Sequence, residues 1–220
     1  MSAPRPLQNR VDPFGALHAV PERGALMGNR GGRLCDDGQN LVRRWAGRRW
    51  IACLCAFKER RREVWGAGYT ELFFLDEATA LAAGHRPCFE CRRGDARRFA
   101  AAFAAPRAPM AADAMDLILH KERLDGRAKR TTRRPFAAFP DGAMVALGEG
   151  AALVWGDALH LWGFGGYGAS VHRPDAGDAE VLTPPSILNA ILNGYRPNSA
   201  LTVPLGTRQE GGSTGKREDT

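Results

Sequence analysis

The sequence predicts an α+β protein, in which a small module of a hairpin and helices precedes a small antiparallel β-meander with a C-terminal helix. Three observations lead to this fold class. Apolar and basic residues alternate between residues 41 and 64, which is typical of paired strands. Helix-start and helix-stop residues bracket short segments between residues 76 and 104. Beyond residue 142, short apolar runs are separated by glycine, which favours a meander.

The composition is that of an ordinary globular protein, because 44% of the 220 residues are hydrophobic and 25% are charged. No stretch approaches the roughly 18 apolar residues that span a bilayer, and the first residues lack the apolar core of a signal peptide. We therefore expect a cytoplasmic protein without a membrane partner. In that compartment five cysteines favour metal binding or burial over disulfides. The formal net charge of +7 suits an anionic partner.

The segment 1–41 is rich in glycine, proline and arginine. We expect it to be ordered only by packing on the module that follows, residues 42–105. That module begins with the predicted hairpin, which contains Cys53 and Cys55 between basic residues. A further strand is predicted for Tyr69–Leu75 because aromatic residues are frequent there.

Two helices are predicted next in this module. Asp76 can cap a short helix, Glu77–Ala83, and Gly84 ends that helix as a C′ glycine. Pro87 suits the first turn of a second helix, from Cys88 to Ala104, because it has no amide hydrogen to leave unpaired. The two cysteines of the Cys-x-x-Cys pair would then lie one turn apart on the same helix face.

The second half begins with a basic connector, residues 106–140, that holds one predicted helix, Ala112–Leu124. Residues 141–205 contain the meander and a closing helix. The predicted strands and helix are Met144–Leu147, Ala152–Val154, Leu159–Trp162 and Ile187–Asn193. We expect the tail, residues 206–220, to be disordered because glycine, serine, threonine and charged residues dominate it.

The Cys-x-x-Cys pair, Cys88 and Cys91, is typical of zinc sites because its spacing lets two thiolates reach one ion. Structural zinc takes four such ligands in a tetrahedron. The ligands that we predict are Cys35, Cys53, Cys88 and Cys91, with Cys55 or His85 as a substitute for Cys35. Buried thiols without a metal are the alternative, since free cysteine is among the most buried residue types. The ion would stabilise a module that is too small for a large apolar core.

Residues 69–93 carry a specific pattern around this pair. An aromatic strand leads into a short Ala-rich helix that ends in Ala-Gly, followed by Arg-Pro-Cys-x-x-Cys and a basic residue. The helix and the pair read Asp76-Glu77-Ala78-Thr79-Ala80-Leu81-Ala82-Ala83-Gly84-His85-Arg86-Pro87-Cys88-Phe89-Glu90-Cys91-Arg92-Arg93. This run resembles the second half of the zinc-binding domain of the Ada DNA-repair family. The same half-motif occurs in small zinc modules attached to nucleases, so it does not by itself select a reaction.

In the Ada domain four cysteines hold zinc, and one of an upstream pair takes a methyl group from a DNA phosphotriester. The resemblance implies that Cys88 and Cys91 are zinc ligands and that Cys53 is a third. The upstream pair of the family is spaced Cys-x-x-x-Cys, whereas this chain has Cys53-Leu54-Cys55. Because of this difference we expect methyl transfer to be absent.

Arginines cluster on both sides of the predicted hairpin and again after the cysteine pair. The phosphate-binding residues that we predict are Arg43, Arg44, Arg48, Arg49, Arg60, Arg61, Arg92 and Arg93. Trp45 and Trp50 could stack on unpaired bases. The leading hypothesis is a zinc protein that binds nucleic acid, DNA in particular, and is related to DNA repair. The alternatives are a repair methyl acceptor that uses a zinc-bound thiolate of Cys53, and a non-catalytic module with a structural zinc and a protein partner.

Overall fold

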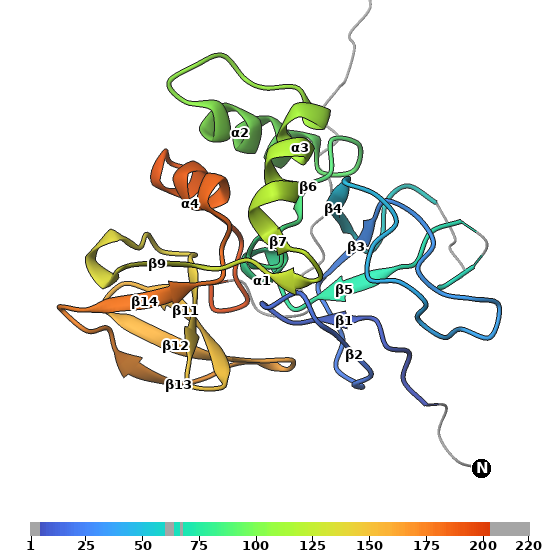
Figure 1. The fold of residues 1–220 in the computed structure, drawn as a ribbon, viewed down its shortest axis with the longest axis horizontal. Helices are drawn as coiled ribbons and strands as arrows, with labels where there is room; N and C mark the ends of the chain where they lie inside the picture. Colours follow the sequence, from blue (N-terminus) through green and yellow to red (C-terminus); the bar gives the residue numbers. More distant parts are fainter. Residues whose placement is uncertain (1–4, 60–63, 67, 203–220) are drawn as a thin grey trace, which may run out of the picture.

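The computed structural model describes residues 5–59, 64–66 and 68–202, and the predicted disordered tail lies outside them. The described residues confirm the α+β class, with two large sheets on either side of a buried helix (Figure 1). The α-helices are α1 Glu77–Ala82, α2 Arg93–Ala104, α3 Ala112–Arg123 and α4 Pro185–Leu192. None of the described helices combines the length and the apolar character that crossing a membrane requires.

The first large sheet has the strand order β2-β1-β5-β3-β4-β6. Its strands are β1 Arg10–Val11, β2 Leu17–His18, β3 Leu26–Arg30, β4 Trp50–Leu54, β5 Leu72–Phe74 and β6 Arg86–Pro87. The pairs β1–β5 and β4–β6 are parallel, whereas the other neighbours are antiparallel. The parallel pair β4–β6 forms one edge of the sheet and positions the cysteines described below.

The prediction of a hairpin between residues 41 and 64 is wrong. Its described residues hold one strand of the sheet, β4, whose antiparallel partner is β3 from the N-terminal segment, with Arg30 opposite Trp50. The long loop between these strands folds back where Gly31 meets Gly47, and a Cβ on Gly31 would lie 2.7 Å from the Gly47 Cα. The segment before residue 41 therefore supplies three strands of the first sheet, which are β1, β2 and β3.

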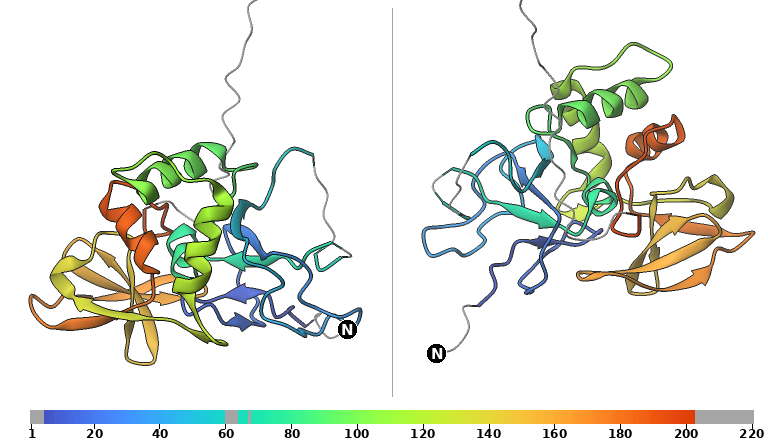
Figure 2. Two further views of the ribbon diagram at one scale, coloured as in Figure 1. Left: turned by 45° about the horizontal axis from the view of Figure 1, so that its top comes forward. Right: turned by 180° about the vertical axis from the view of Figure 1, so that it is seen from behind.

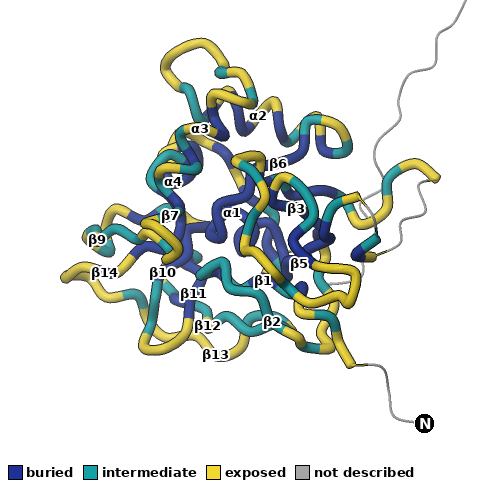
Figure 3. The backbone as a smooth tube through the Cα atoms, turned by 45° about the vertical axis from the view of Figure 1, so that its right-hand side comes forward, coloured by how far each residue is buried: buried dark blue, intermediate teal, exposed yellow. Residues whose placement is uncertain are grey.

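Helix α1 is buried along its whole length (Figure 3). The carboxylate of Asp76 accepts a hydrogen bond of 2.8 Å from a backbone amide in the first turn, which confirms the predicted cap. Gly84 has a φ of +87° and is the C′ residue, as predicted. Alanines let both sheets approach the helix, since Ala80 packs on the first sheet, and Ala78 and Ala82 pack on the second.

The helix predicted from Cys88 to Ala104 starts later, at Arg93. Arg86 and Pro87 are in β6 instead, where they pair in parallel with β4, and the Cys88 amide donates to the Ala52 carbonyl at 3.0 Å. The next residues form the turn that leads into α2. The cysteine pair therefore lies in a turn at the edge of the sheet, because strand pairing takes the residues that would have opened the helix.

The predicted meander is confirmed as part of the second large sheet, which has the order β13-β12-β11-β10-β14-β9. Its strands, antiparallel throughout, are β9 Thr132–Pro135, β10 Met144–Leu147, β11 Gly150–Trp155, β12 Ala158–Gly163, β13 Gly166–His172 and β14 Asp178–Val181. The predicted connector holds α3, the strand β9, the short pair β7 Leu124–Asp125 and β8 Ala128–Lys129, and the 3₁₀ helix Phe136–Ala138. Helix α4 begins two residues before its predicted start, with proline in the first turn.

Buried contacts join the two halves of the chain. The hydroxyl of Tyr195 donates to the Glu77 carboxylate at 2.6 Å, and the hydroxyl of Tyr167 donates to the Asp76 carboxylate at 2.7 Å. Leu81 of α1 also packs with side chains of α2, α3 and α4 in one cluster. Figure 2 shows α1 between the two sheets in two further views, one of them from behind. The site at the edge of the first sheet is thus held by a core to which both halves contribute.

Candidate metal centre and adjoining cleft

Three cysteine side chains meet at the edge of the first sheet. Cys53 is in β4, and Cys88 and Cys91 are in the turn after β6. Their three sulfur atoms lie within 4.8 Å of one another. The strand register explains this arrangement, because Ala52 is opposite Pro87 and the next residue along each strand is a cysteine. All five cysteines of the chain are free thiols.

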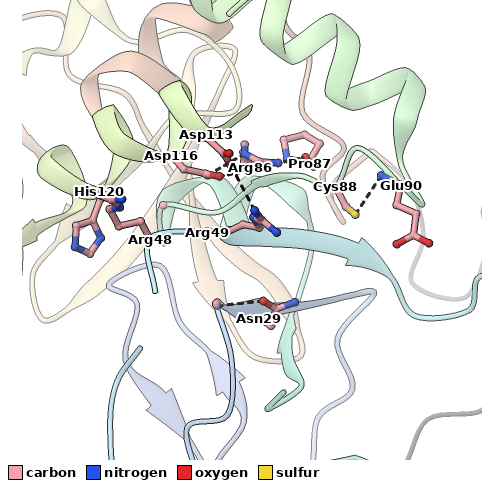
Figure 4. Close-up of polar contacts among 12 residues, drawn as sticks. Asn29, Arg48, Arg49, Arg86, Pro87, Cys88, Glu90, Asp113, Asp116 and His120 are labelled. Atoms are coloured by element: carbon pink, nitrogen blue, oxygen red, sulfur yellow. Dashed lines mark hydrogen bonds and ion pairs between the residues drawn. The ribbon is translucent and has the colours of Figure 1, made fainter. Parts of the chain in front are cut away.

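Backbone amide hydrogens point at two of the three sulfurs. The sulfur of Cys88 accepts a hydrogen bond from the Glu90 amide at 3.4 Å (Figure 4), and the sulfur of Cys91 accepts one from the Leu54 amide at 3.4 Å. Amide hydrogens that point at sulfur stabilise its negative charge. The apolar side chains around the group are Met27, Ile51, Tyr69 and Phe73.

The three thiols do not titrate alike. Hydrogen bonds from Cys53 and then Cys91 lower the pKa of Cys88 to about 2. The bond to Cys88 has the opposite effect on its donor and raises the pKa of Cys53. Cys88 accepts hydrogen bonds from the other two thiols, so its sulfur is the best placed of the three to hold a negative charge. A bound metal ion would favour loss of the remaining protons, since metals bind the thiolate and not the thiol.

The residues present fit a metal ion. Thiolates about 2.3 Å from a tetrahedral zinc ion lie roughly 3.8 Å from one another. The sulfurs here, all within 4.8 Å of one another, need only small side-chain rotations to reach such an arrangement. Thiolate ligands select soft ions such as zinc or copper(I) over magnesium and calcium. The three cysteines can therefore bind a metal ion, with one tetrahedral position left for another ligand.

The other predicted ligands lie elsewhere. Cys35 is held in the loop between β3 and β4 by a bridge to Leu41, and its sulfur is 3.5 Å from the Thr70 hydroxyl. Cys55 follows the end of β4, is exposed, and donates to a backbone carbonyl before β3. His85 is buried between aromatic rings. Within the described part of the chain, no fourth Cys, His, Asp or Glu joins the three-sulfur group.

A cleft of about 760 Å³ adjoins the three cysteines. Ile51 and Tyr69 connect the two sites, because both residues line the cleft and also pack against the three cysteines. The remaining lining residues are Asn29, Gly31, Gly32, Gly47, Arg48, Arg49, Gly68, Asp113 and Asp116, several of which appear in Figure 4. The glycines leave backbone groups accessible, so that a ligand can approach the main chain closely.

Charged side chains in the cleft and next to it differ in how firmly they are paired. Arg86 donates to both carboxylate oxygens of Asp116, at 2.9 and 2.7 Å, and both side chains are buried (Figure 4). Arg49 lies 3.4 Å from Asp113, and both of these side chains are mostly exposed. Because an exposed pair contributes little, Arg49 can exchange Asp113 for an anionic ligand.

Only some of the eight arginines that were predicted to bind phosphate are exposed in the structure. The exposed members are Arg43, Arg44, Arg48, Arg49 and Arg93. Arg92 was predicted to bind phosphate, but it is buried and pairs with Glu77 at 2.7 Å and with Asp95 at 2.8 Å. These two carboxylates neutralise the guanidinium and make its burial possible. Arg60 and Arg61 lie outside the described residues.

The two tryptophans predicted to stack on bases differ in exposure. Trp50 is 3% exposed, and the guanidinium carbons of Arg30 and Arg123 lie 4.1 and 3.9 Å from the centre of its ring. Trp45 is only partly buried. Trp45 therefore remains accessible to a planar ligand, whereas Trp50 is occupied by two cations of the protein.

Sequence reasoning missed the charged residues that α3 brings to this region. Asp116 and Arg123 are buried on the same helix face as Met115 and Leu119. Charged residues at the spacing of an apolar helix face are a usable signal, because burial of a charge requires a partner. The position of Asp116 on an apolar helix face could have indicated a buried ion pair. The partner, Arg86, lies 30 residues away in the sequence, so helix spacing does not identify it.

Comparisons of the chain with protein-family models, with curated proteins and with solved structures gave no match.

Proposed function

We propose that the protein binds one zinc ion through Cys53, Cys88 and Cys91 and binds DNA at the adjoining cleft, as a protein related to DNA repair. The observation that carries the proposal is the convergence of the three sulfurs beside a cleft that exposes arginines. The resemblance of residues 69–93 to the Ada zinc domain supports the same function, since it includes two of the three cysteines.

Zinc is the ion that this group of ligands suits best. Thiolates on a strand and on an adjacent turn, with amide hydrogens directed at two sulfurs, are the ligand type of structural zinc. The ion would join β4 to the turn before α2 and so fix the wall of the cleft. The fourth position would be filled by a ligand from outside the three-sulfur group.

The cleft suits the phosphate backbone of nucleic acid. Arg48 and Arg49 are exposed there, and the neighbouring glycines allow a backbone to come close. Arginine binds phosphate through two parallel hydrogen bonds, which makes it the preferred residue for such contacts. Contacts of this kind bind DNA without reading its sequence.

Burial of Cys53 argues against the alternative of a methyl acceptor. Cys53 is 6% exposed and packs with the apolar side chains that surround the three sulfurs. A thiolate that takes a methyl group from a phosphotriester must be reached by the DNA backbone. We therefore keep the expectation that incubation with methylated DNA adds no mass to the protein.

Metal content should depend on Cys53 and not on Cys35 or Cys55. We expect wild-type protein to contain one zinc per chain and Cys53→Ser to lose it, because a weakly coordinating hydroxyl replaces a thiolate. Cys35→Ser and Cys55→Ser serve as matched controls and should keep the ion. Elemental analysis of the purified proteins makes the comparison. Zinc retained in Cys53→Ser, or lost equally from all three variants, would contradict the assigned ligands.

DNA affinity should fall steeply with salt and depend on Arg48 and Arg49. The double variant Arg48→Ala/Arg49→Ala removes about two phosphate contacts, so the slope of log affinity against log salt should become shallower by about 1.8. Fluorescence anisotropy with a labelled duplex at several salt concentrations measures this slope. Arg23→Ala/Arg133→Ala is the control, because it removes two exposed charges outside the cleft. An equal change of slope in both variants would place the DNA elsewhere.

A further inference from the structure

A second, smaller cavity is lined almost entirely by cationic and aromatic side chains. It measures about 20 Å³ and shares the loop of residues 44–50 with the cleft. Its charged lining residues are Arg30, Arg44, Arg123, Arg127 and Lys129, and none of the lining residues within the described ranges is a carboxylate. Trp45 and Trp50 complete the wall beside these cations.

The innermost cations bind backbone carbonyls in place of carboxylates. Arg30 and Arg123 are each 1% exposed. Arg30 donates to the Gly15 carbonyl at 2.9 Å, and Arg123 donates to the carbonyls of Gly84 at 2.9 Å and Arg48 at 2.6 Å. The buried Nε of Arg123 has no hydrogen-bond partner among the residues that the structure describes. Carbonyl dipoles do not cancel a full charge, so the interior here holds excess positive charge.

Burial and the excess positive charge lower the pKa values of the buried cations. Burial, followed by repulsion from neighbouring arginines, lowers the pKa of Arg30 and of Arg123 to about 9. The same causes lower the pKa of Lys129 to about 7. The carboxylates that act on these cations already have partners, since Asp12 pairs with His18 and Asp116 pairs with Arg86. An anion supplied from outside would remove this unfavourable repulsion.

We propose that the phosphate group of a phosphomonoester binds at the mouth of this cavity, between Arg44 and Arg127, with one oxygen directed inward to the cations Arg30, Arg123 and Lys129. The site is separate from the proposed zinc centre, because no cysteine lines it. Binding there depends neither on the metal nor on DNA in the cleft.

The chemistry favours phosphate over other anions. A phosphomonoester carries nearly two negative charges at neutral pH, which matches several uncompensated cations better than a carboxylate or chloride does. Guanidinium groups also match the geometry of phosphate oxygens. At about 20 Å³ the cavity has room for about one water-sized atom, so it admits a single phosphate oxygen and no nucleoside. The rest of an ester would lie at the entrance, where Arg44 and Arg127 are exposed and Trp45 is partly so.

The first experiment titrates the full-length protein with inorganic phosphate while sodium chloride keeps the ionic strength constant. We expect phosphate to raise the melting temperature in a saturable manner and to change tryptophan fluorescence, because Trp50 touches Arg30 and Arg123. Isothermal titration calorimetry then gives the affinity. The same melting temperature in phosphate and in chloride would overturn the proposal.

Variants at the entrance make the test specific without disturbing the core. Arg44→Ala/Arg127→Ala changes exposed side chains and should weaken phosphate binding about tenfold, as expected for loss of charge-assisted hydrogen bonds. Lys129→Met removes a cation from the cavity wall and should weaken it at least as much. The control Arg23→Ala/Arg133→Ala removes two exposed charges that line neither the cleft nor this cavity, and it should bind phosphate as the wild type does. Wild-type affinity in both cavity variants would contradict the site.

A comparison of ligands separates the possible sources of the phosphate group. Uridine 5′-monophosphate, inorganic phosphate and uridine are titrated in parallel. Tighter binding of the nucleotide than of phosphate would show that the nucleoside adds contacts at the entrance, and equal binding would show that the phosphate group alone is recognised. Both results require that uridine does not compete. Competition by uridine as strong as by the nucleotide would overturn the proposal.

Discussion

Cys88→Ser is expected to release the bound metal and to unfold the first sheet at a temperature well below that of the wild type. Cys88 accepts hydrogen bonds from the other two cysteines of the centre, and it directly follows β6, which pairs with β4. Structural zinc contributes on the order of 10 kcal/mol to the folding of small zinc domains, so loss of at least about 3 kcal/mol in the free energy of unfolding is expected. Circular dichroism during thermal melting, with elemental analysis, measures both effects.

The matched control for this experiment is Cys55→Ser, which makes the same substitution at an exposed cysteine outside the centre. It should melt as the wild type does. A strong chelator should lower the melting temperature of the wild type toward that of Cys88→Ser and change the variant little, because both treatments remove the same ion. Equal melting temperatures for the two serine variants, with metal present in both, would disprove the role of Cys88.

Asp116→Ala is expected to destabilise the protein by about 3 to 5 kcal/mol, because it leaves the buried guanidinium of Arg86 without its partner. The two side chains are 3% and 4% exposed and share two hydrogen bonds. They connect α3 to the strand that precedes Cys88. Loss of this link should therefore also lower metal affinity. Urea unfolding followed by far-ultraviolet circular dichroism gives the change in stability.

Two controls separate the unpaired charge from other effects of this substitution. Asp113→Ala removes an exposed aspartate from the same helix, and it should change stability by no more than about 0.5 kcal/mol. The double variant Arg86→Met/Asp116→Leu removes both charges and should be far more stable than Asp116→Ala, since apolar pairs often replace buried ion pairs without loss. If the double variant is as unstable as the single one, the destabilisation comes from packing and not from charge.

Local sequence signals predicted the elements whose determining contacts lie within a few residues. The cap at Asp76, the C′ glycine Gly84 and the strands of the meander are confirmed for this reason. The Cys-x-x-Cys spacing likewise placed Cys88 and Cys91 beside each other in the structure. A cap, a turn or a short spacing needs no knowledge of distant segments, because it depends on local backbone geometry.

Contacts between distant segments were decided by the tertiary structure. The sequence alone does not show that β3 pairs with β4, and this pairing replaced the predicted hairpin and kept Cys35 in a loop away from the other cysteines. Pairing of β6 with β4 moved the start of α2 to Arg93 and brought Cys53 to the cysteine pair. Strand partners are selected by burial of whole faces, which a spacing pattern does not contain.

The fate of the arginines shows the same division between sequence and fold. The sequence by itself determined the excess of positive charge, the cysteine pair and the α+β class. Only the fold decided that Arg92 is neutralised by two carboxylates, that Arg49 stays exposed, and that Arg30 is buried beside Trp50. The physical reason is that a guanidinium's role depends on the charges and solvent around it, and these come from segments far away in the chain.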